Sequence, residues 1–289
     1  MNNIELSTKY LPLLDQVYKQ NSKTAILEGD EAVMKRGDNG EIKVAKLDMD
    51  ALGDFDRNSG YTKGSTTFRW ETISYDKERS QDLRIDRLDN AESLKLPFAK
   101  LSSEFIRTKV VPETDAARIA KIAGTTGITA KQETLESGAD VIAALRACAN
   151  KMDEDEVDPE NRILFITPTK RGLIDDLDTI KSKEVMAKFS KIIEVPQTRM
   201  YTKIVLETGK ESNGTTKFGY KKAEDGKNIN FLCVEKSAAV VHMEQYIKYF
   251  SPDEDQDGDD NVFKYRNNNL YGHVYENKLA GVYCSYSAE

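Results

Sequence analysis

The segment Asp89–Gly124, DNAESLKLPFAKLSSEFIRTKVVPETDAARIAKIAG, predicts one long helix. Apolar side chains recur in its first half at steps of three and four residues, which places them on one helix face: Ala91, Leu94, Phe98, Leu101 and Phe105. Asp89 can cap the amino end, and Gly124 marks the carboxyl end. A helix of this length would extend for about 50 Å at 1.5 Å per residue. We therefore interpret the segment as a strut to which the rest of the chain attaches.

Two prolines, Pro97 and Pro112, lie inside this segment. A proline lacks the backbone N–H and clashes with the carbonyl four residues earlier, so an interior position costs about 3 kcal/mol or bends the helix. We expect the strut to consist of two or three helical pieces that bend at these prolines. An amphipathic helix that only packs against a core has the same pattern, and this simpler interpretation stays open at this point.

The composition is that of a soluble globular protein. A chain of 289 residues can bury a sizeable core and form one large domain or two smaller ones. No apolar run reaches the length needed to cross a bilayer, and the first residues contain neither a secretory signal nor a transit peptide. We therefore expect the protein to stay in the compartment where it is made and to have no membrane partner.

The charge balance and the cysteines disfavour several classes of function. Forty-nine acidic and 42 basic residues give a net charge of −7, which leaves no basic footprint for nucleic-acid recognition as a primary activity. The three cysteines, Cys148, Cys233 and Cys284, are odd in number and form no C-x-x-C pair. This pattern argues against a disulfide framework or a zinc site, and it fits small buried side chains in a reducing cytoplasm.

The run Thr66–Tyr75, TTFRWETISY, predicts a β-strand because its side chains alternate with period two. Phe68, Trp70 and Thr72 fall on one face, and Arg69 falls on the other. A charged turn, Asp76–Ser80, precedes a second short strand, so we expect Thr66–Asp86 to form a β-hairpin. Neither face is wholly apolar, and an isolated two-stranded hairpin is only marginally stable. The hairpin should therefore lie on the chain's own core or on a neighbouring subunit.

The rest of the chain mixes helices and strands without strict alternation, which favours an α+β fold. A helix is predicted over Gly138–Met152, and buried strands are predicted over Arg162–Thr167 and Ile229–Val234. Further elements are expected in the second half: helices over Thr169–Ile180 and Lys183–Phe189, strands over Ile192–Val195 and Thr202–Glu207, a loop or flexible hairpin over Gly209–Asn228, and a β-rich end over Val262–Tyr286.

The acidic run PDEDQDGDDN is the strongest candidate for a metal site. Asp253, Asp255 and Asp257, followed by Gly258, match the first half of a calcium-binding loop. The second half fails, because Lys264 occupies the twelfth position, where a glutamate must close the coordination shell. These three aspartates are thus a weak metal candidate, and a solvated acidic loop is the preferred interpretation.

No motif supports catalysis. His242 and His273 are the only histidines and do not form H-E-x-x-H, and the sequence contains no G-x-S-x-G, Walker loop or G-x-G-x-x-G. A nucleophilic Cys–His pair has no local support. We therefore predict neither catalytic residues nor a cofactor.

Six segments follow one another in an order that carries more information than each does alone. They are LGDFDRNSGY (52–61), TTFRWETIS (66–74), EFIRTKVVPETDAARIAKIAG (104–124), RILFITPTKRGLI (162–174), VPQTRMYTKI (195–204) and VFKYRNNNLYGHVYENKLAGVYCS (262–285). In this combination the sequence resembles the major capsid proteins of tailed bacteriophages with the Hong Kong 97-type fold. The resemblance covers most of residues 48–286.

The resemblance implies a division of the chain into five parts. They are an N-terminal arm over 1–36, an extended β-hairpin loop over 37–86, a peripheral domain with the spine helix over 87–137, an axial domain over 138–249, and the β-rich return of the peripheral domain over 250–289. The strut at Asp89–Gly124 would be the spine helix. Residues near Phe68 would then reach over a neighbouring subunit.

The resemblance also implies a function without turnover. The chain would self-assemble through pentamers and hexamers into an icosahedral head shell around phage double-stranded DNA, which it would contact without sequence specificity. It would be located in the virion after assembly in the cytoplasm of the bacterial host, with portal, scaffold or decoration proteins as further candidate partners. At the subunit interfaces, Phe68 and Trp70 would be buried anchors, and Arg69 and Arg79 would fix the register.

Two alternatives stay open at this point. One is the shell of an encapsulin-like cellular compartment, which has the same fold. The other is a soluble enzyme or ligand-binding domain whose site is scattered through the sequence. Neither proteolytic maturation nor a cross-link between subunits is inferred from these residues.

Overall fold

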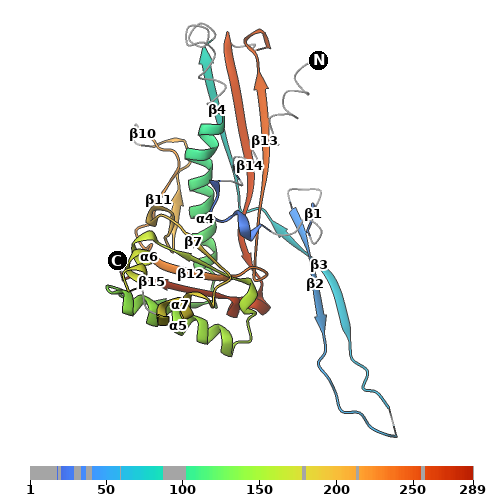
Figure 1. The fold of residues 1–289 in the computed structure, drawn as a ribbon. Helices are drawn as coiled ribbons and strands as arrows, with labels where there is room; N and C mark the ends of the chain where they lie inside the picture. The colour runs from blue at the N-terminus through green and yellow to red at the C-terminus, as the bar shows by residue number, and fades with distance from the viewer. Residues whose placement is uncertain are drawn as a thin grey trace.

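Helix α4, Val111–Ala123, lies between two β-sheets and packs on both (Figure 1). In the computed structural model, the described residues are 18, 21–28, 34–36, 41–58, 60–86, 102–177, 180–212, 215–254 and 258–288. Ile119 and Ile122 of α4 belong to the core of one sheet, and Val111 belongs to the core of the other. The carboxyl-terminal part of the predicted strut is thus the element that joins the two halves of the molecule.

The first sheet has five strands in the order β5-β15-β12-β6-β7. Their bounds are β5 Thr129–Gln132, β6 Arg162–Ile166, β7 Lys191–Glu194, β12 Ile229–Glu235 and β15 Val282–Tyr286. The central pairs are antiparallel, whereas β5 runs parallel to β15 and β7 runs parallel to β6. Every residue of β6 and β12 is buried, because the sheet is covered on both faces.

Three helices cover one face of this sheet: α5 Gly138–Glu154, α6 Pro168–Asp175 and α7 Ile180–Met186 (Figure 1). Leu164 of β6 and Phe231 of β12 pack in the cluster with α5, whereas Phe165 and Leu232, one residue further along each strand, pack in the cluster with Ile119 of α4. Successive side chains of a strand point to opposite faces of the sheet. The apolar run of each strand therefore contributes to both cores.

Helix α5 begins at a capping box in which Ser137 accepts from the Asp140 backbone and Asp140 accepts from the Ser137 backbone. Its first residue, Gly138, lies so close to α6 that a Cβ there would be 2.1 Å from the carbonyl oxygen of Leu173. The sequence-based helix over Gly138–Met152 is confirmed, with two more residues at its end.

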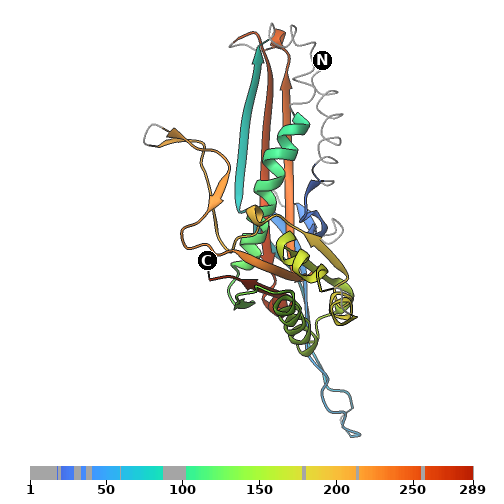
Figure 2. The ribbon, with the colours of Figure 1, turned by 60° about the vertical axis from the view of Figure 1, so that its left-hand side comes forward.

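The second sheet has three long antiparallel strands in the order β13-β14-β4: Ala239–Phe250, Asp260–Val274 and Lys77–Asp86. Phe263 and Tyr265 of β14 point to the helix side and pack with Val110, Val111 and the buried Tyr18. The opposite face carries charged and aromatic side chains. This sheet and α4 form the elongated upper part of the molecule in Figures 1 and 2.

The irregularity expected at Pro112 is a change of helix type. Residues 102–105 are helical, Ile106–Val110 form a π-helical turn, and α4 follows directly, with Pro112 in its first turn. The wider turn accommodates a residue that cannot donate a backbone hydrogen bond. Residues 89–101, with Pro97 and the predicted cap Asp89, lie outside the described residues.

The hairpin expected over Thr66–Asp86 is wrong in its strand pairing. Strand β3, Thr66–Ser74, pairs antiparallel with β2, Glu41–Met49, which in turn pairs with β1, Met34–Arg36. Strand β4 pairs along its whole length with β14 instead. The predicted strands exist, but the chain crosses from one sheet to another at Tyr75 and Asp76. We call residues 41–74 the long hairpin, and Figures 1 and 2 show it projecting from the body.

A second projection, which we call the short hairpin, comprises residues 203–222. Its strands are β8 Ile204–Leu206, β9 Glu211–Ser212, β10 Thr215–Thr216 and β11 Tyr220–Lys222. β8 pairs with β11 and β9 with β10, both antiparallel. Its carboxyl-terminal strands lie in the region 209–228 that the sequence assigned to a loop or flexible hairpin, and Figure 2 shows it projecting away from the sheets.

β13 belongs to the β13-β14-β4 sheet, whereas β5 and β15 belong to the five-stranded sheet. The division of the chain into five parts stays a prediction. Short 3-10 turns complete the described chain: Ala25–Leu27, Pro159–Asn161, Gln197–Arg199, Pro252–Glu254 and Glu276–Gly281.

All three cysteines are buried and free, as expected, and burial raises the pKa of the Cys284 thiol to about 12. Within the described ranges, no helix is both long and apolar enough to span a membrane.

Candidate assembly interface

One face of the long hairpin is apolar and exposed to solvent. The register pairs Leu47 with Phe68, and Met49 and Trp70 each lie two pairs away, on the same face. Phe68 is 60% exposed and Trp70 is 38% exposed, and their rings contact each other edge to face at 5.7 Å. Leu47 and Met49 are 54% and 65% exposed. The predicted anchors Phe68 and Trp70 are therefore part of a larger apolar strip.

The tip of the long hairpin has a defined local structure. Asp50 closes it, because its carboxylate accepts from the backbone N–H of Ser65 at 2.7 Å. Phe55 and Tyr61 contact each other edge to face at 5.1 Å, and Leu52 is fully exposed. The tip thus presents apolar side chains on a closed turn.

Exposed apolar side chains are concentrated on the two hairpins. Of the eleven large apolar side chains that are exposed among the described residues, seven lie on the long hairpin and two on the short one. A contiguous exposed apolar surface marks a place where another molecule binds. The sequence indicated this surface only through Phe68 and Trp70, because the facing strand β2 was not predicted.

The root of the long hairpin is fixed to the three-stranded sheet β13-β14-β4. Ile42 and Ile73 are buried there with Val240 and Leu270. Where the chain leaves β3, the Asp76 carboxylate accepts from the backbone N–H of Tyr271 at 2.9 Å. The hairpin therefore projects from a rigid base.

Both histidines of the chain lie beside this root. The Tyr75 hydroxyl and His242 Nδ1 are 3.1 Å apart, and His273 Nε2 lies 3.9 Å from a carboxylate oxygen of Glu71. The two histidines stand on the neighbouring strands β13 and β14. His273 lies near Glu71 of the hairpin, and His242 contacts Tyr75, the residue that follows it, so both histidines contribute to its attachment.

Arg79, expected at a subunit interface, makes its contacts within the chain. It lies on β4, and its guanidinium is held by Glu113 of α4 and by the backbone carbonyl of Glu207 in the short hairpin. Although burial lowers it, the Glu113 carboxylate raises the pKa of Arg79 above its ordinary value. Arg69 is exposed on the charged face of β3. Interface roles for Phe68, Arg69, Trp70 and Arg79 stay predictions, and within the chain Arg79 links β4 to α4 and to the short hairpin.

A buried ionic cluster that sequence analysis missed ties the amino-terminal segment to α4. The Asp115 carboxylate is fully buried and accepts from Ser22 Oγ, from the backbone N–H groups of Lys23 and Thr24, and from Thr24 Oγ1 at 2.6 to 3.2 Å. Arg199 Nη1 lies 3.2 Å from the same carboxylate. A charge inside an otherwise apolar helix pattern was the only sequence signal for this cluster.

Arg118, one turn further along α4, completes the attachment. Its side chain is fully buried, donates to Glu28 at 3.1 Å, and lies 5.8 Å from the centre of the Tyr18 ring. Burial raises the pKa of the Tyr18 hydroxyl far above its ordinary value, so Tyr18 stays neutral beside this cation. Tyr18 and residues 21–28 are therefore held by charge as well as by packing.

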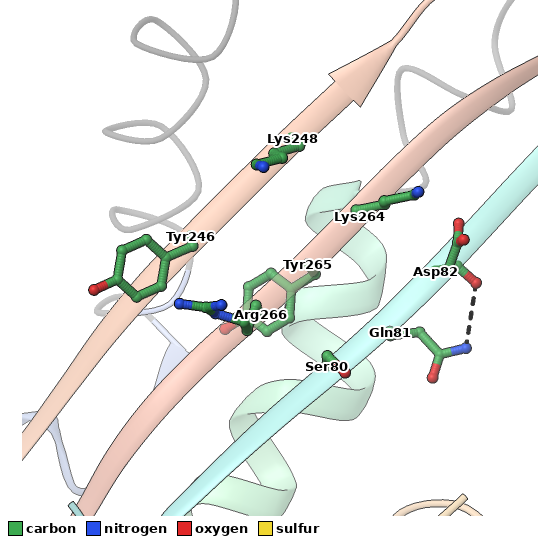
Figure 3. A pocket seen from close by; sticks show the side chains of 8 residues that line it. All are labelled: Ser80, Gln81, Asp82, Tyr246, Lys248, Lys264, Tyr265 and Arg266. Atoms are coloured by element: carbon green, nitrogen blue, oxygen red, sulfur yellow. Dashed lines mark hydrogen bonds between the residues drawn. The ribbon is translucent and has the colours of Figure 1, made fainter. Parts of the chain in front are cut away.

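The free face of the three-stranded sheet contains a shallow hollow of about 440 Å³ (Figure 3). Lys248 of β13 and Lys264 of β14 stand directly opposite each other, and Arg266 lies over the Tyr246 ring at 4.8 Å. Acidic side chains alternate with these cations, since Asp82 lines the same hollow and Glu78 pairs with Arg266. The face is polar and close to charge balance, which distinguishes it from the apolar strip.

The calcium candidates are only partly described. Asp253 lies in the 3-10 turn Pro252–Glu254, whereas Asp255 and Asp257 lie outside the described residues. In the part of the chain that the structure describes, no group of three His, Cys, Asp or Glu residues could hold a metal ion.

No family model and no curated protein matches the sequence. Solved structures are nevertheless similar over most of the chain. The structure from Mycobacterium phage Che8 aligns with a TM-score of 0.55 and 14% identity over 90% of this chain and 89% of that chain. The capsid structure of Cyanophage P-SCSP1u aligns with a TM-score of 0.53 and 14% identity over 91% and 87%.

A third similar structure is the virus-like particle from Pyrococcus furiosus, with a TM-score of 0.52 and 9% identity over 96% of this chain and 99% of that chain. At these identities the similarity establishes the fold. The chain has the α+β Hong Kong 97-type fold, as expected from the order of its sequence segments.

Proposed function

We propose that this chain is a major capsid protein that self-assembles into the icosahedral head shell of a tailed bacteriophage. The observation that carries the proposal is the long hairpin, which exposes the strip Leu47, Met49, Phe68 and Trp70 although its root is rigidly attached. A monomer gains nothing from such a strip. Burying one large apolar side chain is worth about 1.5 to 3 kcal/mol, so a few of them stabilise a subunit contact.

The mechanism is association without turnover. The apolar strip and the surface that it binds on a neighbouring copy are different patches of the same chain. The contact is therefore heterologous, and it closes into a ring when the rotation between neighbouring copies allows closure. Rings of five and six subunits then combine into a closed shell. Many modest interfaces suffice, because each subunit is held by several neighbours at once.

The partners follow from this role. The shell encloses double-stranded DNA without reading its sequence, in agreement with a net charge of −7. Portal, scaffold and decoration proteins are further partners, and the protein is located in the virion after assembly in the host cytoplasm. Its role is structural, with no chemical step.

A second candidate is the shell of an encapsulin-like compartment, which is favoured by the similarity to the Pyrococcus virus-like particle over 96% of this chain. The contents of the particle separate the two functions. A phage head protects a long double-stranded DNA from nuclease, whereas a compartment shell contains protein cargo.

Electron microscopy of the purified full-length chain tests the proposal. We expect capsomers or uniform closed shells, and a protein that stays monomeric at high concentration under all salt conditions would overturn it. A variant in which Ala51–Gly64 is replaced by Asn-Gly keeps the pair Asp50 and Ser65 and shortens only the tip. This variant should fold normally but assemble poorly. The deletion must stop before β4, because Arg79 links that strand to α4.

A further inference from the structure

The short hairpin carries exposed apolar side chains at a distance from the sheets. Phe218 is 64% exposed, and Val205 is 41% exposed. Gly209, with φ of +69°, faces the ring of Phe218, and a Cβ there would be 2.9 Å from it. This close packing keeps the ring on the outside of the hairpin.

The base of the short hairpin is fixed to the body. The Tyr220 hydroxyl donates to the carbonyl of Thr198 at 3.0 Å, and the carbonyl of Glu207 accepts from Arg79 at 2.7 Å. The two strands continue towards the tip, where the N–H of Gly209 donates to the carbonyl of Lys217 at 3.0 Å. The described part of the hairpin therefore has a defined path as far as Gly209 and Lys217.

The charge of the short hairpin is basic, both at its base and at its tip. Residues 203–222 contain five lysines and two glutamates. Near the base, Lys203 pairs with Asp225 at 2.5 Å and Lys221 pairs with Glu207 at 2.9 Å. At the tip, Lys210 and Lys217 have no carboxylate partner within the described residues.

The tip of the long hairpin has the opposite charge. Residues 48–65, DMDALGDFDRNSGYTKGS, contain four aspartates against one arginine and one lysine. Leu52 and Phe55 are exposed between these acids. Each hairpin tip thus combines apolar side chains with an excess of one sign of charge, and the two signs are complementary.

The two tips of one chain cannot meet, since Figures 1 and 2 show them projecting from different sides of the body. We propose that the short hairpin of one copy binds the acidic tip of the long hairpin of a neighbouring copy. This inference rests on the proposed shell function and names the partner of the long hairpin. Lys210 and Lys217 face the aspartates, and Phe218 packs with Leu52 and Phe55.

A nucleic acid is the other polyanion that lysines could bind. The tip of the short hairpin presents only two lysines without a carboxylate partner, beside Glu211, whereas nucleic-acid sites use a row of cations along the phosphate backbone. An acidic segment of limited size with apolar side chains fits this surface better.

Charge reversal on each side tests the contact. Lys210→Glu with Lys217→Glu, and separately Asp54→Lys, should each slow shell assembly about tenfold or more at low salt, because like charges then face each other. Asp54 suits this purpose, since its hydrogen bond to Thr62 uses the backbone carbonyl. Combining the reversals should restore assembly, and Lys210→Arg with Lys217→Arg should assemble as the unchanged chain does.

Three outcomes would overturn the inference: normal assembly of the lysine reversals, no recovery in the combined variant, or a loss of DNA binding with assembly intact. If the unchanged chain never assembles, the proposed function fails first and this contact fails with it. Thermal unfolding of the unassembled variants shows whether each one folds.

Disulfide formation between introduced cysteines gives a second test, which does not depend on a variant that fails to assemble. The native cysteines are buried, so new ones at exposed positions react selectively. A mixture of Leu52→Cys and Lys210→Cys chains, oxidised after assembly with oxidised glutathione, should yield covalent dimers on a non-reducing gel. The double variant should yield longer ladders. Absence of both products in assembled shells would contradict the contact.

Discussion

The Arg79 guanidinium donates to both carboxylate oxygens of Glu113, at 2.7 Å from Nε and at 3.1 Å from Nη2. Its Nη1 donates to the backbone carbonyl of Glu207 at 2.7 Å. One side chain on β4 therefore holds α4 and the base of the short hairpin. Both partners of the ion pair are mostly shielded from water, with side chains 24% and 16% exposed.

Replacing Arg79 by lysine should destabilise the fold, because an ammonium group cannot reproduce the two parallel hydrogen bonds and the third contact. We expect the free energy of unfolding to fall by about 1 to 3 kcal/mol. Urea denaturation of the unassembled protein measures this. An unchanged midpoint and slope would contradict an internal role for Arg79.

Replacing Phe68 by alanine should leave the isolated chain stable and impair assembly. The side chain is 60% exposed, so its loss should change the free energy of unfolding by less than about 0.5 kcal/mol. The matched control on the same strand is Ile73→Ala at the buried root, which should cost about 2 to 4 kcal/mol. Light scattering and thermal unfolding separate the two effects, and normal assembly by Phe68→Ala would count against the strip.

Replacing Asp115 by alanine should release the amino-terminal segment from α4. The carboxylate is fully buried, and its removal leaves the nearby Arg199 and the N–H groups of Lys23 and Thr24 without their acceptor. Breaking such a buried pair costs about 3 to 5 kcal/mol. Limited proteolysis with trypsin should then cleave at Lys23 much faster than in the unchanged chain. Equal cleavage rates would show that the segment is held in another way.

Replacing Gly138 by alanine should destabilise the α5–α6 contact, because the new Cβ would be 2.1 Å from a backbone oxygen of Leu173. We expect a loss of about 1 to 3 kcal/mol, as for overpacking in general. Gly172→Ala in α6 is the control, since nothing lies within 4 Å of its Cβ position. That substitution should stabilise the helix by about 0.5 to 1 kcal/mol. Thermal unfolding tests the prediction: the Gly138→Ala chain should melt at a lower temperature than the Gly172→Ala chain.

The contribution of Asp153 to stability should depend on pH. Hydrogen bonds from Arg162 and Lys188, at 2.6 and 3.0 Å, hold the pKa of this carboxyl below its ordinary value. A carboxyl whose pKa is lower in the folded state stabilises the fold above its unfolded pKa, about 3.9, and loses this effect as the pH falls through the folded value.

Asp153→Asn should therefore cost about 0.5 to 1 kcal/mol at pH 7, since the carboxylate is 45% exposed and partly screened. The difference from the unchanged chain should shrink as the pH falls below the unfolded value of about 3.9. A series of urea denaturations from pH 7 downwards measures it. A deficit of the same size in acid would show that the effect is not electrostatic.

Local patterns determined much of this protein. The apolar stripe of α5, the apolar runs of β6 and β12, and the alternation of β3 predicted the observed elements, because the hydrophobic period acts within a few residues. The order of family-like segments indicated the fold although no single segment did.

Tertiary structure alone decided which strands pair and what the charged residues do. β4 pairs with β14, 174 to 192 residues away in the sequence, and alternation along β4 gives no information about that partner. The same applies to Arg79: its sequence context fits a subunit contact, whereas the fold brings Glu113 within 2.7 Å and uses the charge internally. Strand pairing and ion pairing join residues distant in sequence, so their energies depend on positions that only the folded backbone sets.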